Sequence, residues 1–348
     1  MKVVLRLLAG PAGALLLAFV LAAVAMLIAG VNPVDGFSAL IRGSLGGRRP
    51  IAETLVQTTA LLFPALGVSL AFRAGLFNIG AEGQLLMGGL FAGAVGAHLA
   101  GPSWLTVVAL LLLGMLGGGI WGGIAGWLRA RFNASEIIST LMLNFIALSL
   151  AGYLVAGPLK SPLASGAETA PLLPNNGLPA FPSIGSLSFG DTRLTISILI
   201  AIATAIVLRF VFTRTVFGYE LRAAGEAPEA ARRSGINMPR MTLIALSLSG
   251  AVAGLGGAAI VTGVLHRFNT SLSPGYGYTA IAVALVGDLN PLWVCVAALG
   301  FGILEAGGLM MQADAGVPKD AIRVIEGLII LVLAARRYFA TRATSAPI

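Results

Sequence analysis

Charged residues are scarce in this sequence. Of its 348 residues, only 10% are Asp, Glu, Lys or Arg, whereas 57% are hydrophobic and the mean hydropathy is +0.93. The core of a soluble domain does not need so much apolar sequence, but a chain that crosses a lipid bilayer several times does. We therefore predict an all-α polytopic membrane protein, with residues 1–348 forming a single transmembrane domain.

Cysteine and histidine are almost absent. The single cysteine, Cys295, excludes an internal disulfide, and its place in an apolar run favours a packing role over a redox role. The two histidines, His98 and His266, are far apart, and no Cys/His spacing indicates a metal site. No Ser/His or Asp/Asp pair supports an intramembrane enzyme. We expect neither a metal nor catalysis in this chain.

A nucleotide-binding loop is also missing. The pattern Gly-x-x-x-x-Gly-Lys-Ser/Thr, which cradles phosphates in P-loop ATPases, does not occur in the sequence. Energy from ATP would therefore have to come from another subunit, and we expect no cofactor in this chain. The net charge of +8 does not favour nucleic acid as a partner, because basic residues in cytoplasmic loops of a membrane protein face anionic lipid.

The sequence consists largely of long hydrophobic runs. The first run could be a secretory signal peptide with Ala23-Val24-Ala25 as its cleavage site, but its length and the runs after it favour an uncleaved helix. Because about 20 apolar residues span a bilayer as an α-helix, the sequence predicts about ten transmembrane helices. Their approximate positions are 7–31, 54–72, 77–99, 104–128, 136–157, 194–212, 241–264, 276–290, 291–311 and 322–337.

Two connections between these segments are long. Residues 158–193 are rich in Pro, Gly and Ser, which predicts a loop outside the membrane, whereas residues 213–240 are charged with a helical pattern. If the N-terminus lies inside, most Arg and Lys residues fall on the cytoplasmic side, although Arg42, Arg48 and Arg49 fall in the first outer loop. We therefore predict that both termini are cytoplasmic, that 158–193 is extracytoplasmic and that 213–240 is cytoplasmic.

Two similar stretches indicate an internal duplication. RAGLFNIGAEGQLLMGGLFAGAVGA starts at Arg73, and HRFNTSLSPGYGYTAIAVALVG starts at His266. Each has Arg, then Phe-Asn, then a Gly-broken stretch, then a run of small residues. The first begins on the cytoplasmic side of the predicted topology and the second on the outer side, as an inverted repeat of helices 2–5 and 7–10 requires.

Polar residues gather in these two Gly-broken stretches. Irregular backbone at membrane depth is tolerated only where protein or a water-filled cavity surrounds it, and polar side chains there usually face the bundle interior or a pathway. Amides offer both donors and acceptors, which suits a neutral, hydroxyl-rich or base-bearing solute. The alternative is that the same groups join helices by hydrogen bonds. The candidate translocation-pathway residues are Asn78, Glu82, Gln84, Asn144, Asn269, Tyr276 and Tyr278.

The charged connection contains a predicted short helix over Pro228 to Ser234. Pro228 suits a first helical turn, and Gly235 is placed to end the helix. Glu226 and Glu229 suit the positive N-terminal end of the helix dipole, and the arginines that follow suit the other end. Small alanines would leave a low-profile face able to enter a groove of a partner, although the charge pattern alone favours a solvated helix without a partner.

At this helix the sequence resembles a known family. EAARRSG, from Glu229 to Gly235, is similar to the EAA-loop signature of ABC-importer permeases: Glu-Ala-Ala, three residues, Gly. In that family the helix docks into a cleft of the cytoplasmic ATPase and transmits its closure. Of the Ile and Leu-Pro that usually follow, Ile244 stands one place early and no Leu-Pro comes after it, which fits the branch with ten-helix permeases for simple sugars, nucleosides and branched-chain amino acids. The coupling residues that the resemblance implies are Gly225, Glu226, Glu229, Ala230, Ala231, Arg232, Arg233 and Gly235.

Within that branch the sequence is most similar to nucleoside permeases. FNIGAEGQLLMGG, PGYGYTAIAVALVGDLNP and GVPKDAIRVIEGLIILVLAA carry this resemblance, which covers nearly the whole chain. It implies a permease subunit in the bacterial cytoplasmic (inner) membrane that moves a nucleoside by alternating access. It also implies three partners, namely a cytoplasmic ATPase that binds ATP and Mg, a second permease chain, and an extracytoplasmic solute-binding lipoprotein.

Two other functions stay open at this point. The same machinery could import ribose-like sugars or branched-chain amino acids. A different class, an ion-coupled secondary transporter, could use the carboxylates of Glu82 and Glu305 to carry protons.

Overall fold

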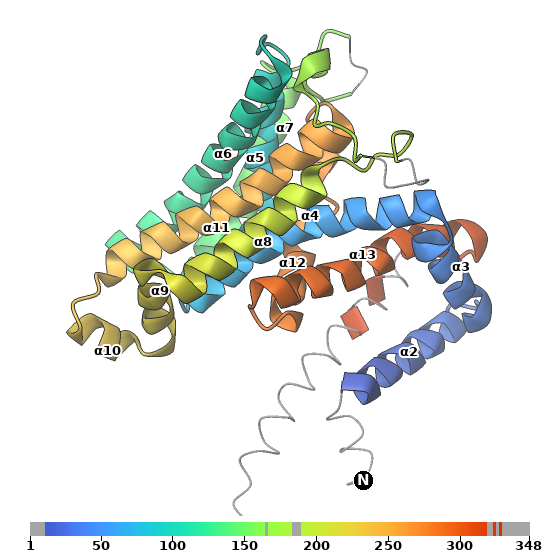
Figure 1. The fold of residues 1–348 in the computed structure, drawn as a ribbon, viewed down its shortest axis with the longest axis horizontal. Helices are drawn as coiled ribbons and strands as arrows, with labels where there is room; N and C mark the ends of the chain where they lie inside the picture. Colours follow the sequence, from blue (N-terminus) through green and yellow to red (C-terminus); the bar gives the residue numbers. More distant parts are fainter. Residues whose placement is uncertain (1–10, 164–165, 183–188, 319–322, 325–326, 329–348) are drawn as a thin grey trace, which may run out of the picture. The chain divides into compact units, whose positions relative to one another are not determined.

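The computed structural model describes residues 11–163, 166–182, 189–318, 323–324 and 327–328. Over these residues the chain is almost entirely helical, with helices α2 to α13 and short 3-10 or π segments (Figure 1). It divides into two compact units, one made of Met1–Thr54 with Gly300–Ile348 and the other of Leu55–Leu299. The predicted all-helical class is confirmed for the described residues.

The first unit contains a sharp bend that the sequence analysis missed. Helix α2 (Pro11–Ile28) is followed by α3 (Pro33–Leu45), and the part Phe19–Ile28 of α2 makes an angle of 117° with α3. Asn32 caps α3, its side chain accepting a hydrogen bond of 3.0 Å from the Val34 amide, and Pro33 occupies the first turn, where its missing N–H costs nothing.

The core of the first unit explains why α3 forms. Its buried residues are Ala22, Met26, Ala39, Leu40, Met311 and Val317. The stretch between the first two predicted spans, including Arg42, was predicted to be a loop on the outer side, and it is instead largely the helix α3. A search for about 20 apolar residues does not detect an amphipathic helix of 13 residues that buries one face.

The second unit holds most of the chain's helices. It begins within α4 (Arg48–Arg73), which starts in the first unit, and ends within α13 (Pro291–Asp314). The elements between them are α5 (Ala81–Gly96), α6 (Ser103–Phe132), α7 (Glu136–Ala156), η1 (Pro174–Asn176), α8 (Ser197–Arg214), α9 (Val216–Glu226), α10 (Pro228–Arg233), α11 (Met238–Ile260), η2 (Val261–Leu265, a π-helix), η3 (Thr270–Leu272) and α12 (Tyr276–Val286).

Small residues allow the central helices of the second unit to approach one another closely. Helix α11 packs against both α5 and α6 (Figure 1). A Cβ built at Gly88 would collide with the carbonyl oxygen of Gly254, and one built at Gly118 would collide with that of Gly250. Backbone-to-backbone packing of this kind is typical of helices that associate within lipid. The lipid tails are as apolar as the helices, so close packing takes the place of the hydrophobic effect in holding the helices together.

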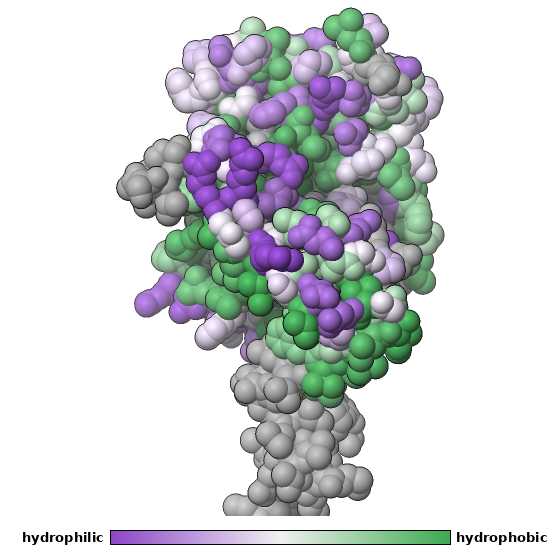
Figure 2. Space-filling view, turned by 90° about the vertical axis from the view of Figure 1, so that its right-hand side faces the viewer, coloured by the Kyte–Doolittle hydropathy of each residue, from purple (hydrophilic) through white to green (hydrophobic). Residues whose placement is uncertain are grey.

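Six helices of the described residues are long and apolar enough to cross a membrane, or up to seven if the bent pair of Phe19–Ile28 and Pro33–Leu45 forms one span. They agree with six of the ten predicted segments. Helix α5, with 16 residues, and α12, with 11, are not among them, so the segments 77–99 and 276–290 were predicted too long. The predicted segment 322–337 lies almost wholly outside the described residues. A multi-pass chain is thus supported, with broad hydrophobic areas on its exterior (Figure 2).

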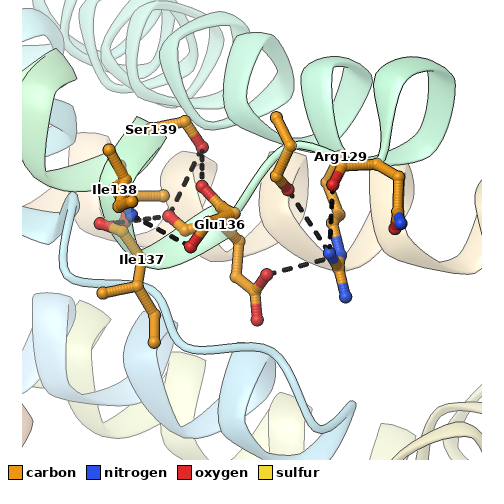
Figure 3. A network of polar contacts seen from close by, with 9 residues as sticks. Arg129, Glu136, Ile137, Ile138 and Ser139 are labelled. Carbon is orange, nitrogen blue, oxygen red and sulfur yellow. Dashed lines mark hydrogen bonds and ion pairs between the residues drawn. The ribbon is translucent and has the colours of Figure 1, made fainter.

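The turn between α6 and α7 is held by charged and polar residues at its two ends. Asn133 ends α6 in the left-handed conformation (φ 53°), and the Ser135 side chain caps α7 by accepting from the Ile138 amide. The Arg129 guanidinium lies 3.3 Å from the Glu136 carboxylate and also donates to the Ala134 carbonyl at 3.4 Å (Figure 3). Glu136 is thus paired at a helix start.

The connection 158–193 has irregular backbone over most of its described residues. It lies against the segment that follows the π-helix. The Leu172 amide donates to the His266 carbonyl at 2.8 Å, and Arg267 forms an ion pair of 2.6 Å with Glu168. Glu168 and Leu172 of the connection therefore bind to the start of the second predicted repeat, at His266 and Arg267.

Candidate functional site

The first of the two Gly-broken stretches, which starts at Arg73, is irregular as predicted, and it lies between α4 and α5. Gly75 takes a left-handed conformation (φ +72°) that glycine adopts without steric cost, residues 76–79 are not helical, and α5 begins at Ala81. Helix α7 stabilises this start from outside. Its Asn144 side chain accepts a hydrogen bond of 2.8 Å from the Gly83 amide, and Thr140 accepts one of 3.2 Å from the Ile79 amide.

Asn78 and Gln84 form a reciprocal amide pair inside the bundle. Asn78 is fully buried, and its Nδ2 donates to Gln84 Oε1 at 2.8 Å while its Oδ1 accepts from Gln84 Nε2 at 3.1 Å. Asn78 Nδ2 also donates to the Ser249 hydroxyl of α11 at 2.7 Å, and that hydroxyl donates to the Gly67 carbonyl of α4 at 2.7 Å. The network joins three helices, which is the helix-joining role left open by the sequence.

The starts of α5 and α12 meet at Glu82. The Glu82 carboxylate accepts a hydrogen bond of 2.7 Å from the Gly277 amide in the first turn of α12. Gly277 lies so close to the Ala81–Glu82 backbone that an added Cβ would collide with the Glu82 amide. Ser273 completes the α12 start, because its hydroxyl accepts from the Tyr276 amide at 2.9 Å. The two Gly-broken stretches singled out from the sequence are thus in contact.

Two tyrosines of α12 extend this cluster. The Tyr278 hydroxyl accepts a hydrogen bond of 3.2 Å from Asn144 Nδ2, and its side chain is exposed. The Tyr276 hydroxyl donates to Gln57 of α4 at 2.6 Å. Six of the seven candidate pathway residues therefore lie around the paired starts of α5 and α12.

Asn269 lies elsewhere. Its neighbours Phe268 and Leu272 contact Gly93 and Gly89, in the C-terminal half of α5. Its side-chain Oδ1 is buried and has no hydrogen-bond partner among the described residues. The two Phe-Asn pairs of the predicted repeat therefore lie at opposite ends of α5.

Four polar partners at this site were not predicted: Thr140, Ser249, Ser273 and Gln57. Thr140 could have been found, because it precedes Asn144 by four residues and therefore lies on the same face of the helix. Ser249 is a polar residue within an apolar run, but only the tertiary structure brings it to Asn78.

The predicted coupling helix is present as α10, with Pro228 in its first turn. Gly235 follows it with φ +87°, a conformation that favours glycine and ends the helix as expected. Helices α9 and α10 lie together at one end of α8 and α11 (Figure 1). The side chains of Glu229 and Arg232 are exposed and lie 3.8 Å apart.

Of the two alanines in α10, only Ala230 can contribute to the low-profile docking face that the sequence predicts. Ala231 is buried in the protein itself, with 3% of its surface exposed, whereas Ala230 is exposed. Gly225, in the last turn of α9, is instead a packing contact, because an added Cβ would lie 2.8 Å from the Gly75 amide. The exposed coupling candidates are Glu226, Glu229, Ala230, Arg232, Arg233 and Gly235.

Residues 51–334 match the protein family described as "Branched-chain amino acid transport system / permease component". The chain belongs to this permease family. It is therefore a permease component of an ABC importer and not itself an enzyme. Permeases of this kind work with a separate ATPase, a substrate-binding protein and a second permease chain.

Three relatives show which transporters this permease resembles. It is 34% identical to the glucose ABC transporter permease protein TsgB13 of Haloferax volcanii, over 94% of this chain and 87% of that protein. It is 34% identical to the guanosine ABC transporter permease protein NupP of Bacillus subtilis, over 93% and 92%. It is 33% identical to the nucleoside ABC transporter permease protein NupB of Lactococcus lactis, over 94% and 90%. No solved structure matches the permease.

Proposed function

We propose that this permease imports a nucleoside. The observation that carries the proposal is its identity of 33–34% to two permeases named for guanosine and nucleoside transport, over at least nine tenths of each chain. A sugar is the second candidate cargo, because a permease named for glucose is equally similar. Both are neutral, hydroxyl-bearing solutes.

The site at Glu82 supports a neutral cargo over an amino acid. Helix N-termini attract anions through their free amides and their dipole, and broken transporter helices can use them to hold a substrate carboxylate. Here the Gly277 amide at the start of α12 already donates to Glu82, and the Gly83 amide of α5 donates to Asn144. A solute carboxylate at this junction would meet two amides whose hydrogens are already donated to other groups.

The proposed mechanism is alternating access driven by a partner ATPase. The ATPase binds ATP and Mg, and its closure displaces α10 through exposed residues such as Glu229 and Arg232. The solute crosses between this chain and a second permease chain, either a paralogue or a second copy, after delivery by an extracytoplasmic lipoprotein. The residues around the starts of α5 and α12 then set the shape of the route, with Tyr278 as the exposed member of the group.

The full architecture is part of the same proposal. We propose ten transmembrane helices with both termini in the cytoplasm, α10 on the cytoplasmic side and the 158–193 connection outside. An inverted repeat is supported by the pairing of two short helices, α5 and α12, each preceded by irregular backbone. Reporter fusions or cysteine labelling in the two connections would test the orientation.

Uptake of labelled adenosine and uridine, in cells with and without the gene, tests the cargo. Unlabelled guanosine, ribose and leucine serve as competitors. We expect gene-dependent uptake that nucleosides block and that ribose and leucine do not. Inhibition by ribose would move the cargo to the sugars. Uptake that survives ATP depletion but stops with a proton ionophore would contradict the ATP-driven mechanism.

A further inference from the structure

The last turn of α9 lies directly against the turn that leads into α5. An alanine-like Cβ at Gly225 would collide with the Arg73 carbonyl oxygen and would lie 2.8 Å from the Gly75 amide. In the other direction, a Cβ at Gly75 would lie 3.0 Å from the Gly225 Cα. Two glycines thus let the backbones touch with no side chain between them. A displacement of α9 toward this turn cannot be absorbed by rotation of a flexible side chain.

Helix α9 is joined to the predicted coupling helix α10 by a very short connection, so the two should move together. Only Ala227 separates the end of α9 from the start of α10. At its other end Gly218 is in backbone contact with Val211 of α8, and Leu221 and Ala224 are buried. A movement imposed on α10 therefore reaches Gly225 through a short helix that is held at its far end.

The side chain of Arg73 extends this contact to a second turn. Its Nε donates a hydrogen bond of 2.8 Å to the Leu289 carbonyl, in the connection between α12 and α13. Its guanidinium carbon lies 4.8 Å from the centre of the Phe212 ring of α8. The backbone carbonyl of the same residue lies against Gly225 of α9. Arg73 therefore meets α9 through its backbone, and meets α8 and the turn after α12 through its side chain.

The turn after α12 is conformationally unusual. Asp288 and Leu289 have φ values of +53° and +55°, which non-glycine residues rarely adopt and which are sterically costly for leucine. The carbonyl of Leu289, one of these two residues, accepts the hydrogen bond from Arg73. A turn with this backbone has alternatives of lower local energy, so its conformation depends on the contacts that hold it.

We propose that Arg73 is a positioning residue that makes the α12–α13 turn move together with α9 and α10, which we call the coupling segment. Movement of α10 is delivered to the α4–α5 turn by the Gly225–Gly75 contact, and Arg73 carries it to Leu289. The two short helices are already joined at their starts by Glu82, so both ends of α12 then move with α5. This inference rests on the proposed ATP-driven import.

The test uses the complete transporter, reconstituted with its ATPase, second permease and binding protein. The variant is Arg73→Lys, which keeps a cation near Phe212 but lacks the Nε–H that bonds to Leu289. The matched control is Arg131→Lys, the same change at an exposed arginine at the end of α6. We measure solute moved per ATP hydrolysed, and ATPase stimulation by the loaded binding protein.

We expect Arg73→Lys to lower the solute moved per ATP about tenfold, within the usual range of coupling between two sites. Basal ATPase activity and the Arg131→Lys transporter should match the wild type. An unchanged ratio in Arg73→Lys, with working wild type, overturns the inference. If the wild type shows no ATP-driven nucleoside uptake, the proposed cargo fails instead, and the same ratio is measured with the solute that the binding protein retains.

Amide hydrogen exchange supplies a second readout that does not depend on cargo. In the wild type, trapping the ATPase in its closed state should change exchange at both 74–80 and 287–290. In Arg73→Lys the change at 74–80 should persist, and that at 287–290 should be lost. Equal responses of both turns in wild type and variant would show that Arg73 does not link them. A general structural role would instead raise exchange at both turns before nucleotide is added.

Discussion

The carboxylate of Glu82 accepts the amide hydrogen of Gly277 at 2.7 Å, and this bond fastens the start of α5 to the start of α12. Residues almost 200 positions apart are thus joined at the first turns of two helices that are each too short to be span candidates. A negative charge at a helix N-terminus is favourable, because the first amides lack partners within their own helix and the dipole is positive there.

Glu82 should stabilise the permease through this bond. Replacing Glu82 by Ala should lower the free energy of unfolding by about 2 kcal/mol, as expected for loss of a charged hydrogen bond. Replacing it by Gln keeps an acceptor but removes the charge, and should cost about half as much. Thermal melting of the purified transporter in detergent tests whether stability falls from the wild type to Glu82→Gln to Glu82→Ala. Equal melting of both variants and wild type would contradict the role given to Glu82.

Asn78→Leu should reduce the amount of folded permease in the membrane. The substitution leaves Gln84 and Ser249 without their buried partner, at about 1–3 kcal/mol for each unpaired group. Ser249→Ala removes one partner only and should have a smaller effect. Membrane levels and melting temperature are measured together with uptake. If uptake per folded molecule is unchanged, Asn78 joins helices and does not line the route.

The exposed end of the coupling segment should be needed for transport but not for folding. Glu229→Lys should abolish ATP-driven uptake and weaken recovery of the ATPase with the permease, while membrane levels stay as in the wild type. Wild-type uptake in this variant would remove α10 from the coupling mechanism.

Gly235→Ala should also uncouple transport, because φ +87° is strained for alanine by about 1–2 kcal/mol and the end of α10 would shift. The matched control is Gly30→Ala, at φ +76° with no atom within 4 Å of the added Cβ. Both changes add similar local strain. Only the first should change the solute moved per ATP, and equal effects of the two would mean that strain alone is responsible.

The contact of α5 with α11 should tolerate no side chain. Gly88→Ala places a methyl group against the Gly254 carbonyl, so the helices must separate and lose packing, at a cost of about 1–3 kcal/mol. Gly300→Ala, where the added Cβ meets nothing within 4 Å, is the control. Melting temperature and membrane level should fall in the first variant only. A stable Gly88→Ala permease would show that the two helices can move apart at little cost.

Much of the helical pattern was predictable, because the relevant signals are local. Six long apolar runs gave six helices near their predicted positions, and Pro228 and Gly235 marked both ends of α10. The break before α5 was visible as glycines beside Asn78. Helix α12 was predicted too long, since its end at Gly287 is set by a turn in which Asp288 and Leu289 take left-handed conformations.

The partners of the site residues could not be predicted in this way. A sequence shows that Asn78 and Glu82 are polar and lie in apolar surroundings, but not that Ser249 or Gly277 will face them. Ala231 has the same composition signal as Ala230, yet only one of the two is buried. Such differences depend on which face of a short helix meets its neighbours, and a helix of six residues is too short to carry a clear periodic pattern.

Helix α9 has the dimensions of a lever arm. Its fulcrum is the backbone contact of Gly218 with Val211, and its tip is Gly225, seven residues further on. At 1.5 Å of rise per residue this arm is roughly 10 Å long, so a tilt of about 10° carries the tip roughly 2 Å. A modest tilt of α9, imposed by the six-residue helix α10 that follows it, is therefore large enough, by geometry alone, to shift the turn before α5 by more than a bond length.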